Sequence, residues 1–572
     1  MASTPELECK KILVYRCLHA VGFSLATQYF LLAVFLLFVN FHPLHPISWI
    51  SSTVGLVFSF YTWFCSMPLI AATIVYGIFL GNAHLAGRKY YSSRFSWLVA
   101  KTPKKAAFFA IHGVLGFLTA WLYSRFLGED YRNLTFSCFE DSTCINSRFT
   151  FITVNGIYAG VYYFVRTFLT KDIEVEFPVI QEKRYIKIRS KLYSNLYNSL
   201  FKSLVPTLMF TLFYCIFGGL INERVGSIFG AKTDGELSSL ISIFSNIRLI
   251  LYVWVLSSQI LTNMNLINSF FSMLLTEEIQ FPIEKSVHVN DGVTTLVEAL
   301  ALDRLPIAKQ LAAFDLFRLS NTSVSGRRQQ IFSLSSPGNH PHTWNSLSAQ
   351  CLVVMNVYVD ELKNSLTKIS NLKNPIPGVQ FCADNATLNA QKLLIRQYNQ
   401  SCSIRRMMMD EPTPAPQPTV SPQENIIETV KKFLEQSIKN ALLAVPGLFY
   451  LFGEPDGAKT KFLIKNSQEV ILVTQGLAGI CAISILEDKY GVVQGELSKI
   501  LKALLNLKTE LDKLSNVNIN GRKLDKNYFI LKSAVKKSLY RICTVFGDYL
   551  RDIIEEPEDL RNLLCFVSYQ EG

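Results

Sequence analysis

Six long apolar runs between residues 20 and 275 constrain the fold of this chain more than any other feature. The runs cover Ala20–Val39, a stretch within Val54–Leu80, Ala106–Phe126, Phe149–Leu169, Leu204–Ile221 and Ile247–Leu275. A helix of about 20 residues, rising about 1.5 Å per residue, crosses the roughly 30 Å hydrocarbon core of a bilayer. Because backbone amides find no water inside lipid, each run is expected to form a transmembrane helix.

The composition fits a chain that is half membrane-embedded and half soluble. Of its 572 residues, 49% are apolar, and the mean hydropathy is +0.24. We therefore expect an all-α protein in which residues 20–275 form a six-helix transmembrane domain and the remainder forms a soluble helical domain.

The positive charges of the connecting segments alternate along the membrane half. The N-terminus has Lys10, Lys11 and Arg16, and the segments at 81–105 and 171–191 each have six Lys or Arg, whereas the segments between them have few. Since Lys and Arg accumulate on the cytosolic side, residues 1–19 are predicted to be a cytosolic N-terminus, with the C-terminus on the same side.

This topology also accounts for the net charge of +12. Nucleic-acid binding would favour a basic run interleaved with aromatic residues, and the second half of the sequence contains none. We therefore expect the lipid bilayer as a partner and no direct contact with nucleic acid.

The third connecting segment, predicted to be luminal, contains two features of an oxidising compartment. Asn133-Leu134-Thr135 is a glycosylation sequon, and Cys138 and Cys144 lie just after it. A disulfide and two unpaired thiols both fit this pair, while most of the other cysteines are expected to be free.

The apolar runs contain few ionisable groups. His112 is the main one, and a single histidine on an apolar helix is more often a packing residue than a proton relay. Small residues, namely Gly113 and Gly116 in the third run and Gly156 and Gly160 in the fourth, favour close helix packing. The runs therefore indicate an anchor more than a conduit.

The second half divides at a proline-rich segment. Residues 276–402 are predicted to form the first part of the soluble domain, 403–424 a linker and 425–572 the second part. Apolar periodicity predicts helices over 294–319 with a break at Pro306, and at 426–438, 497–514 and 531–550. The apolar stretch Val470–Leu486 is short and contains Gln475, so it is interpreted as a buried helix.

Known catalytic and cofactor-binding patterns are missing from the sequence. It has no Gly-rich phosphate loop ending in Gly-Lys-Ser/Thr, no His-Glu-x-x-His and no Cys-x-x-Cys pair. His340 and His342 flank a proline without nearby cysteines or acids, so capping and packing explain them better than metal binding. Glu487 and Asp488 are expected to cap the next helix. We predict no enzyme activity, cofactor or metal.

Several strings resemble a known family. They are His45-Pro46-Ile47-Ser48-Trp49, Phe177-Pro178-Val179-Ile180, Phe281-Pro282, Glu487-Asp488 with Gly491-Val492-Val493-Gln494, and Tyr540-Arg541-Ile542 with Phe546-Gly547. The most specific string, called the signature segment below, contains Arg327, Arg328, Phe332, Pro337, Gly338, His340, His342 and Trp344. Together they resemble the transmembrane nucleoporin family named for the nuclear division cycle, except at the linker, which is shorter than in vertebrate members.

The resemblance implies a non-enzymatic anchor of the nuclear pore complex in the nuclear envelope, with a role in pore assembly. It implies that the soluble domain recruits other nucleoporins: aladin, an inner-ring nucleoporin with a membrane-binding amphipathic helix, and other pore-membrane proteins. The signature segment is either a binding surface or a brace within its own domain. The alternative class is a multi-span transporter or a lipid-modifying membrane enzyme.

Glycosidase treatment of the full-length chain tests the predicted orientation. We expect a loss of mass that disappears in Asn133→Gln, because only a luminal sequon meets the glycosylation machinery. Modification at Asn321 or Asn385 would contradict the topology, since both lie in the half predicted to be cytosolic.

Overall fold

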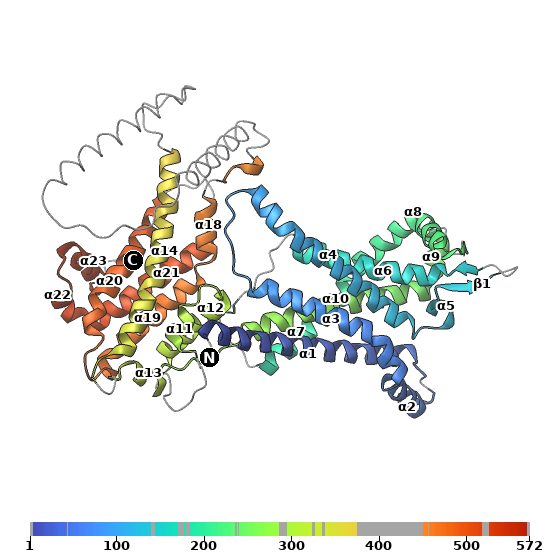
Figure 1. Cartoon of the computed structure of the whole chain (residues 1–572), viewed down its shortest axis with the longest axis horizontal. Coiled ribbons are helices and arrows are strands. Elements are labelled where there is room, and N and C mark those ends of the chain that lie inside the picture. Colours follow the sequence, from blue (N-terminus) through green and yellow to red (C-terminus); the bar gives the residue numbers. More distant parts are fainter. Residues whose placement is uncertain are drawn as a thin grey trace, which may run out of the picture.

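Two bodies follow one another along the longest axis of the molecule, a bundle of long helices and a helical domain (Figure 1). The computed structural model describes residues 4–42, 44–138, 143–169, 175, 177–178, 184–234, 237, 240–284, 294–322, 326–334, 338–373, 450–455, 457–516 and 525–568. The predicted linker at 403–424, the predicted helix at 426–438 and Pro337 lie outside these residues.

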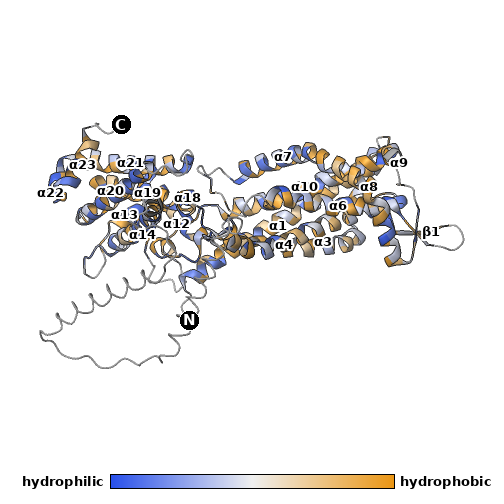
Figure 2. Cartoon of the chain, turned by 90° about the horizontal axis from the view of Figure 1, so that it is seen from above, coloured by the Kyte–Doolittle hydropathy of each residue, from blue (hydrophilic) through white to orange (hydrophobic). Residues whose placement is uncertain are grey.

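The bundle contains all of the long helices of the first half. These are α1 (Pro5–Val39), α2 (Pro46–Val57), α3 (Phe60–Leu85), α4 (Arg94–Ser124), α6 (Ser147–Phe164), α7 (Arg184–Lys202), α8 (Leu204–Phe229) and α10 (Ile247–Leu275). Its short elements are α5 (Glu129–Arg132), a π-helical turn (Val165–Leu169), α9 (Leu240–Ser245), β1 (Thr135–Ser137), β2 (Thr143–Ile145) and β3 (Lys232–Thr233). Hydrophobic residues run along most of the bundle helices, and hydrophilic residues are more frequent in the helical domain (Figure 2).

The helical domain is built from helices on both sides of the proline-rich segment. They are α11 (Leu296–Leu300), α12 (Pro306–Asn321), α13 (Gly326–Ile331), α14 (His342–Lys373), α18 (Ala458–Lys465), α19 (Gln468–Glu487), α20 (Gln494–Asn516), α21 (Lys526–Phe546), a 3-10 turn (Gly547–Tyr549), α22 (Leu550–Ile553) and α23 (Pro557–Val567). The predicted break at Pro306 is confirmed, since α12 begins there.

In the sequence, α14 comes before the proline-rich segment and α18 comes after it, yet the two helices pack directly against each other. The Thr460 hydroxyl donates to the Ser365 hydroxyl at 3.0 Å, and the Tyr358 hydroxyl donates to the Leu463 carbonyl at 3.4 Å. The two parts of the helical domain are therefore joined through a common core.

The all-α expectation is confirmed, but several helix boundaries differ from the predicted runs; α1 already begins at Pro5 and α4 at Arg94. The second run is divided: α2 ends at Val57, and α3 begins at Phe60 behind Ser59, whose hydroxyl accepts a hydrogen bond from the Tyr61 amide. The fifth helix, α8, continues well beyond Ile221, to Phe229. Hydropathy missed the break at Ser59 because the residues on both sides of it are apolar, and it missed the end of α8 because Asn222, Glu223 and Arg224 end the apolar run without ending the helix.

Six described helices are long and apolar enough to cross a membrane, but they are not the predicted six. Five of these segments, α1, α3, α4, α7 with α8, and α10, match predicted runs. The fourth run instead forms α6 and the π-helical turn. Much of α6 is buried among its neighbours, including Thr150, Thr153 and Asn155, so it needs fewer apolar side chains facing lipid.

The sixth helix that qualifies by composition is α19, which lies in the helical domain (Figure 1). Its buried side chains, among them Val473, Leu477 and Cys481, belong to the common core with those of α12, α14 and α21. The interpretation of this stretch as a buried helix is therefore supported.

Glycines let the backbones of α4 and α6 approach each other closely. A Cβ added to Gly116 would lie 2.1 Å from the carbonyl oxygen of Gly156, and one added to Gly160 would lie 2.1 Å from the carbonyl oxygen of His112. A side chain at either position would collide with backbone, which cannot move aside cheaply. The predicted close packing through small residues is confirmed.

Buried polar side chains within the bundle form contacts between helices. Thr73 donates to Gln28 at 3.2 Å, joining α3 to α1, and Asn155 donates to Ser257 at 2.9 Å, joining α6 to α10. The ring of His112 packs against Tyr76, with ring centroids 5.0 Å apart. These contacts are typical of helix packing in membranes.

A small sheet closes the end of the bundle far from the helical domain (Figure 1). Strand β2 pairs antiparallel with β1 and parallel with β3. A disulfide joins Cys138 to Cys144, and Asn133, just before β1, is exposed. The eight other cysteines in the described residues are free. Strands this short leave no periodic signal, so the sheet was not predicted.

Gly160→Ala tests the contact between α4 and α6. We expect the free energy of unfolding to fall by about 1–3 kcal/mol, because the new methyl group overlaps the His112 carbonyl. The measurement is the melting temperature of the detergent-purified protein, followed by size-exclusion chromatography after heating.

Gly219→Ala is the matched control, because a Cβ at Gly219 meets nothing within 4 Å. Equal melting temperatures for the two variants would contradict the close approach of the two backbones.

Candidate functional site

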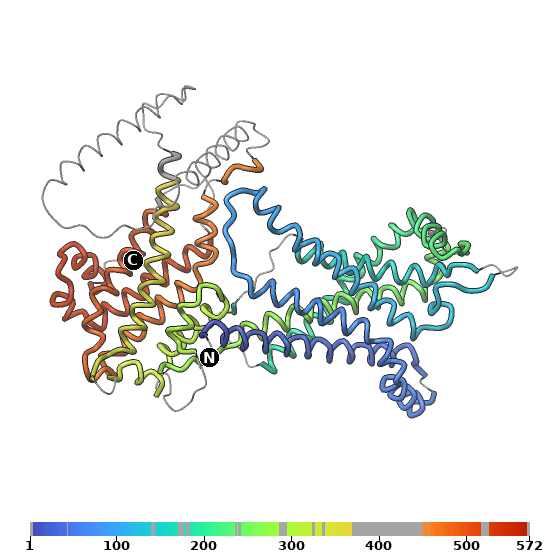
Figure 3. Tube along the Cα trace, viewed as in Figure 1, coloured from blue at the N-terminus to red at the C-terminus, as the bar shows by residue number. Residues whose placement is uncertain are grey.

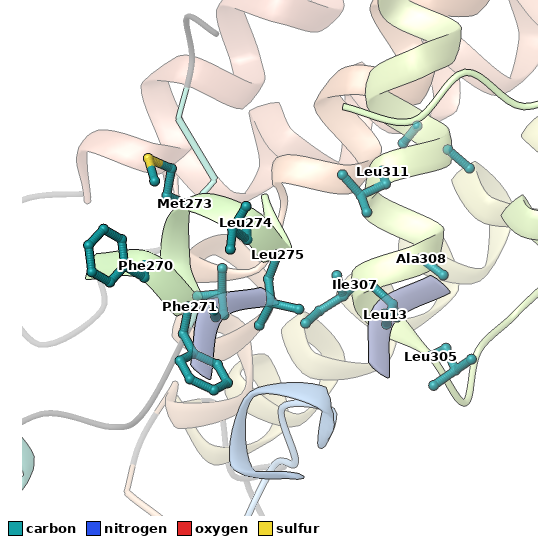
Figure 4. Packing of buried hydrophobic residues seen from close by; sticks show 14 of the residues in the cluster. Leu13, Phe270, Phe271, Met273, Leu274, Leu275, Leu305, Ile307, Ala308 and Leu311 are labelled. Atoms are coloured by element: carbon teal, nitrogen blue, oxygen red, sulfur yellow. The ribbon is translucent and has the colours of Figure 1, made fainter. Parts of the chain in front are cut away.

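The bundle and the helical domain meet at a junction formed by the start of α1, the end of α10 and the start of α12. Helix α1 has 35 residues, which corresponds to about 52 Å and exceeds the roughly 30 Å hydrocarbon core. The side chain of Leu13 lies beside Ile307 of α12, and Leu275 at the end of α10 points into the same space (Figure 4). All three side chains are buried, so the junction has an apolar core.

Arg16 of α1 caps the C-terminal end of α10. Its guanidinium donates to the carbonyls of Leu274 and Glu278, each at 3.1 Å, and also to the carbonyl of Glu277. The last turn of α10 contains no basic residue of its own. Arg16 therefore satisfies carbonyls that the helix leaves open and places a positive charge at the negative end of its dipole.

Further polar contacts surround this cap. Thr294 donates to Glu8 of α1 at 3.1 Å. Arg318 of α12 pairs with Glu278, and Arg184 at the start of α7 pairs with Glu277. The start of α1, the start of α7 and α12 are thus all tied to the segment that follows α10.

Within the helical domain, Arg327 and Asp315 hold this same segment in place. Asp315 is buried and accepts from the Phe281 amide at 2.9 Å. Arg327 donates to both oxygens of Asp315, at 2.7 and 3.2 Å, and to the Phe281 carbonyl at 2.6 Å. The Phe281-Pro282 string and the start of the signature segment, separate in sequence, therefore form one bonded unit.

Arg328 joins the ends of two helices inside the domain. It is 1% exposed; its Nε donates to Glu487 at 2.8 Å and its Nη1 to the Leu319 carbonyl at 3.1 Å. The hydrogen bond with Glu487 raises the pKa of Arg328 above its ordinary value. Because Glu487 is an acid at the C-terminal end of α19, where the helix dipole disfavours negative charge, Arg328 neutralises an otherwise unfavourable position.

The prediction that Glu487 caps the next helix is therefore wrong, whereas Asp488 does form hydrogen bonds to the backbone just before that helix. The Asp488 carboxylate accepts from the amides of Tyr490 and Val493, at 3.1 and 3.0 Å. Helix α20 begins at the next residue, Gln494. Glu487 instead ends α19 and faces Arg328.

The aromatic residues of the signature segment are buried. Trp344 is 0% exposed and Phe332 is 3% exposed, and their ring centroids lie 6.4 Å apart. Trp344 Nε1 is buried and has no hydrogen-bond partner in the described part of the chain. Both side chains therefore contribute to the core and are inaccessible to a partner in this conformation.

The turn between these aromatic residues is exposed. Gly338 and Asn339 have positive φ angles of 123° and 50°, and His340 and His342 are exposed. Glu284 connects the two ends of the turn, because the hydroxyls of Ser333 and Thr343 donate to its carboxylate at 3.0 and 3.1 Å. Among the described residues, no group of three or more His, Cys, Asp or Glu side chains is placed to hold a metal ion.

The signature segment was visible in the sequence, but its partners were not. Sequence reasoning pointed to Arg327 and Arg328 and missed Arg16 and Asp315. Arg16 was counted as one of several basic residues near the membrane, and Asp315 is a single acid on an amphipathic helix. Neither has a local pattern that indicates a contact far away in the sequence.

Comparison with known protein families identifies this architecture. The family described as "Nucleoporin protein Ndc1-Nup" matches residues 11–564. The chain belongs to this family. The expected family is confirmed, and with the apolar helices it makes the chain a transmembrane nucleoporin.

Relatives from three animals support the assignment to the Ndc1-Nup family. Nucleoporin Ndc1 of Drosophila melanogaster is 40% identical over 578 residues, covering 100% of both chains. Nucleoporin NDC1 of Homo sapiens is 24% identical over 659 residues, covering 98% of this chain and 97% of the relative. Nucleoporin ndc-1 of Caenorhabditis briggsae is 25% identical over 291 residues, covering 50% and 45%. All three are named as nucleoporins and none as an enzyme, in agreement with the predicted structural role.

Arg328→Gln tests whether the signature segment braces the domain. We expect the free energy of unfolding to fall by about 3–5 kcal/mol, because Glu487 loses its charge partner and the carbonyls at the end of α12 lose a donor. The measurement is the denaturation midpoint of the purified full-length chain.

His342→Ala, in the same segment but exposed, is the control and should change this free energy by less than about 0.5 kcal/mol. The bracing role is refuted if Arg328→Gln is as stable as the wild type.

Proposed function

We propose that this chain is a structural anchor of the nuclear pore complex in the nuclear envelope, and that its helical domain recruits other nucleoporins and supports pore assembly. The observation that carries the proposal is the junction built on Arg16, Leu13 and Ile307. Because the domain is bonded to the ends of two membrane helices, a partner bound to it is held at a fixed place on the bilayer. An anchor requires this property.

We infer that both termini face the cytosolic or pore side. Both ends of the described chain lie toward the helical domain, at the same end of the bundle (Figure 3). The basic segment at 81–105 belongs to that end, whereas Asn133 and the Cys138–Cys144 disulfide belong to the opposite end. The positive-inside rule and the preference of disulfides for an oxidising lumen both favour this orientation.

The partners implied by the family resemblance are aladin, an inner-ring nucleoporin with an amphipathic helix, and other pore-membrane proteins. Within the signature segment, the turn with Gly338, His340 and His342 is exposed and therefore accessible to such partners. Its shape is maintained by buried Trp344 and by Glu284, so it presents a fixed surface. Exposed positive-φ residues maintained by their surroundings are typical of functional turns.

The transporter alternative requires polar groups facing a pathway through the membrane. Gln28 and Asn155 bond instead to side chains of neighbouring helices, which favours packing over transport. His112 Nε2 and Asn263 Oδ1, however, have no partner among the described residues. Solute flux through liposomes containing the purified chain is the result that would favour a transporter.

Fluorescent tagging of the full-length chain tests the proposal in cells. We expect a punctate nuclear rim for the wild type and for His340→Ala/His342→Ala, because the exposed turn is not needed for folding. Affinity capture from the same cells should recover less of the partner nucleoporins with the double variant than with the wild type.

Trp344→Ala separates binding from stability, because removal of a buried tryptophan costs about 3–5 kcal/mol. It should lose stability, whereas the histidine variant should not. A plasma-membrane or diffuse reticular signal for the wild type would refute the pore assignment, and full capture by the histidine variant would exclude the turn as the binding surface.

A further inference from the structure

A cavity of about 630 Å³ lies where α3 ends and α4 begins, against the first turns of α18. From its lining we propose that it binds the phosphorylated headgroup of an anionic membrane lipid, a phosphoinositide with more than one phosphate. The bundle supplies one wall through the connection from Ala86 to Ser93 and the start of α4. The helical domain supplies the other through Pro455, Phe462 and Asn466.

The charge of this cavity is entirely positive among the residues described as lining it. The basic residues are Arg88, Lys89, Arg94, Lys101, Lys104, Lys105 and Lys465, and no Asp or Glu lines it. Glu454 is nearby, where its carboxylate accepts from the Tyr90 hydroxyl. Basic side chains that lie close together repel each other, and a multiply phosphorylated group in the cavity would offset this repulsion.

Some of these basic side chains make contacts within the protein, and others are accessible to a ligand. Arg94 stacks over the ring of Tyr450 at 3.6 Å, and Lys105 donates to the Leu169 carbonyl at 3.1 Å. Arg88 bonds to Asn466 and so ties the connection to the helical domain. Lys89 and Lys104 are exposed and have no polar partner in the described part of the chain, so their ammonium groups are available for phosphate.

The cavity lies at the boundary between hydrocarbon and water. The apolar run of α4 begins at Ala106, immediately after Lys104 and Lys105. Buried Phe108 and the partly exposed Trp97 line the same cavity. Trp is typical of membrane interfaces. The basic groups and the apolar residues adjoin here, so a lipid can place its headgroup in the cavity and keep its acyl chains in the bilayer. A free phosphate or a soluble peptide would not gain from the apolar side of the site.

The positive-inside rule accounts for the basic residues of the 81–105 segment but not for the whole cavity. Lys465 lies in α18 of the helical domain, outside the sequence flanking the predicted membrane runs. Lys465 lines the same cavity only because the tertiary structure places α18 beside the start of α4. Under the orientation proposed above, on which this step rests, this end faces the leaflet that contains the anionic lipids.

The test uses the full-length chain in phosphatidylcholine nanodiscs and a fluorescent short-chain phosphatidylinositol bisphosphate as the probe. We expect saturable binding by the wild type, and binding about tenfold weaker, or more, for Lys89→Gln/Lys104→Gln, because each lysine near a membrane contributes attraction to an anionic lipid. The control Lys489→Gln/Lys537→Gln removes two exposed lysines of the helical domain that do not line the cavity, and it should bind like the wild type.

Three results would overturn the proposal. Absence of saturable probe binding by the wild type would exclude the site, and equal weakening in both double variants would mean that net charge alone attracts the lipid. Competition by inositol trisphosphate as effective as that by the unlabelled lipid would indicate a soluble phosphate ligand instead. Binding is measured on purified protein without other nucleoporins, so its failure would be distinguishable from failure of the proposed function at the pore.

Discussion

The carbonyl groups at the end of α10 determine how the two bodies of this protein are joined. A helix end leaves its last carbonyls without partners, and α10 ends where the chain leaves the bundle for the helical domain. Arg16 supplies the missing donors from α1, 258 residues away from Leu274 in sequence. The first and last long helices of the bundle are thereby tied at one point, and the domain starts in a defined direction. Leu13 and Ile307 then add apolar packing around this polar contact.

The architecture could be predicted from hydropathy, and the junction could not. Long runs such as Ile247–Leu275 must be helical in lipid, so their existence follows from the bilayer alone. The helix of the fourth run, α6, is not apolar enough to qualify as a membrane span by composition. Neighbouring helices, and not lipid, surround positions such as Asn155, so polar residues are tolerated there. The ion pairs of Arg328 with Glu487 and of Arg327 with Asp315 join residues 159 and 12 positions apart. Contacts of this kind have no period, and so periodicity cannot reveal them.

The signature segment combines two roles that the sequence alone left as alternatives. Its arginines and aromatic residues are internal, where Arg328 neutralises the acid that ends α19 and Trp344 fills the core. The short turn through His340 and His342 is exposed. A segment of this kind is recognisable because many of its residues serve folding, while the few that can meet a partner depend on that internal framework for their position.

The direct packing of α14 against α18 separates the integrity of the fold from the length of chain between them. Ser365 and Thr460 are held together by the domain itself, so the connection between the helices need only return to the same place. The entropic cost of closing such a connection grows slowly, by about 0.6 kcal/mol for each doubling of length. Insertions between these two helices are therefore an inexpensive way for members of this family to diverge in evolution.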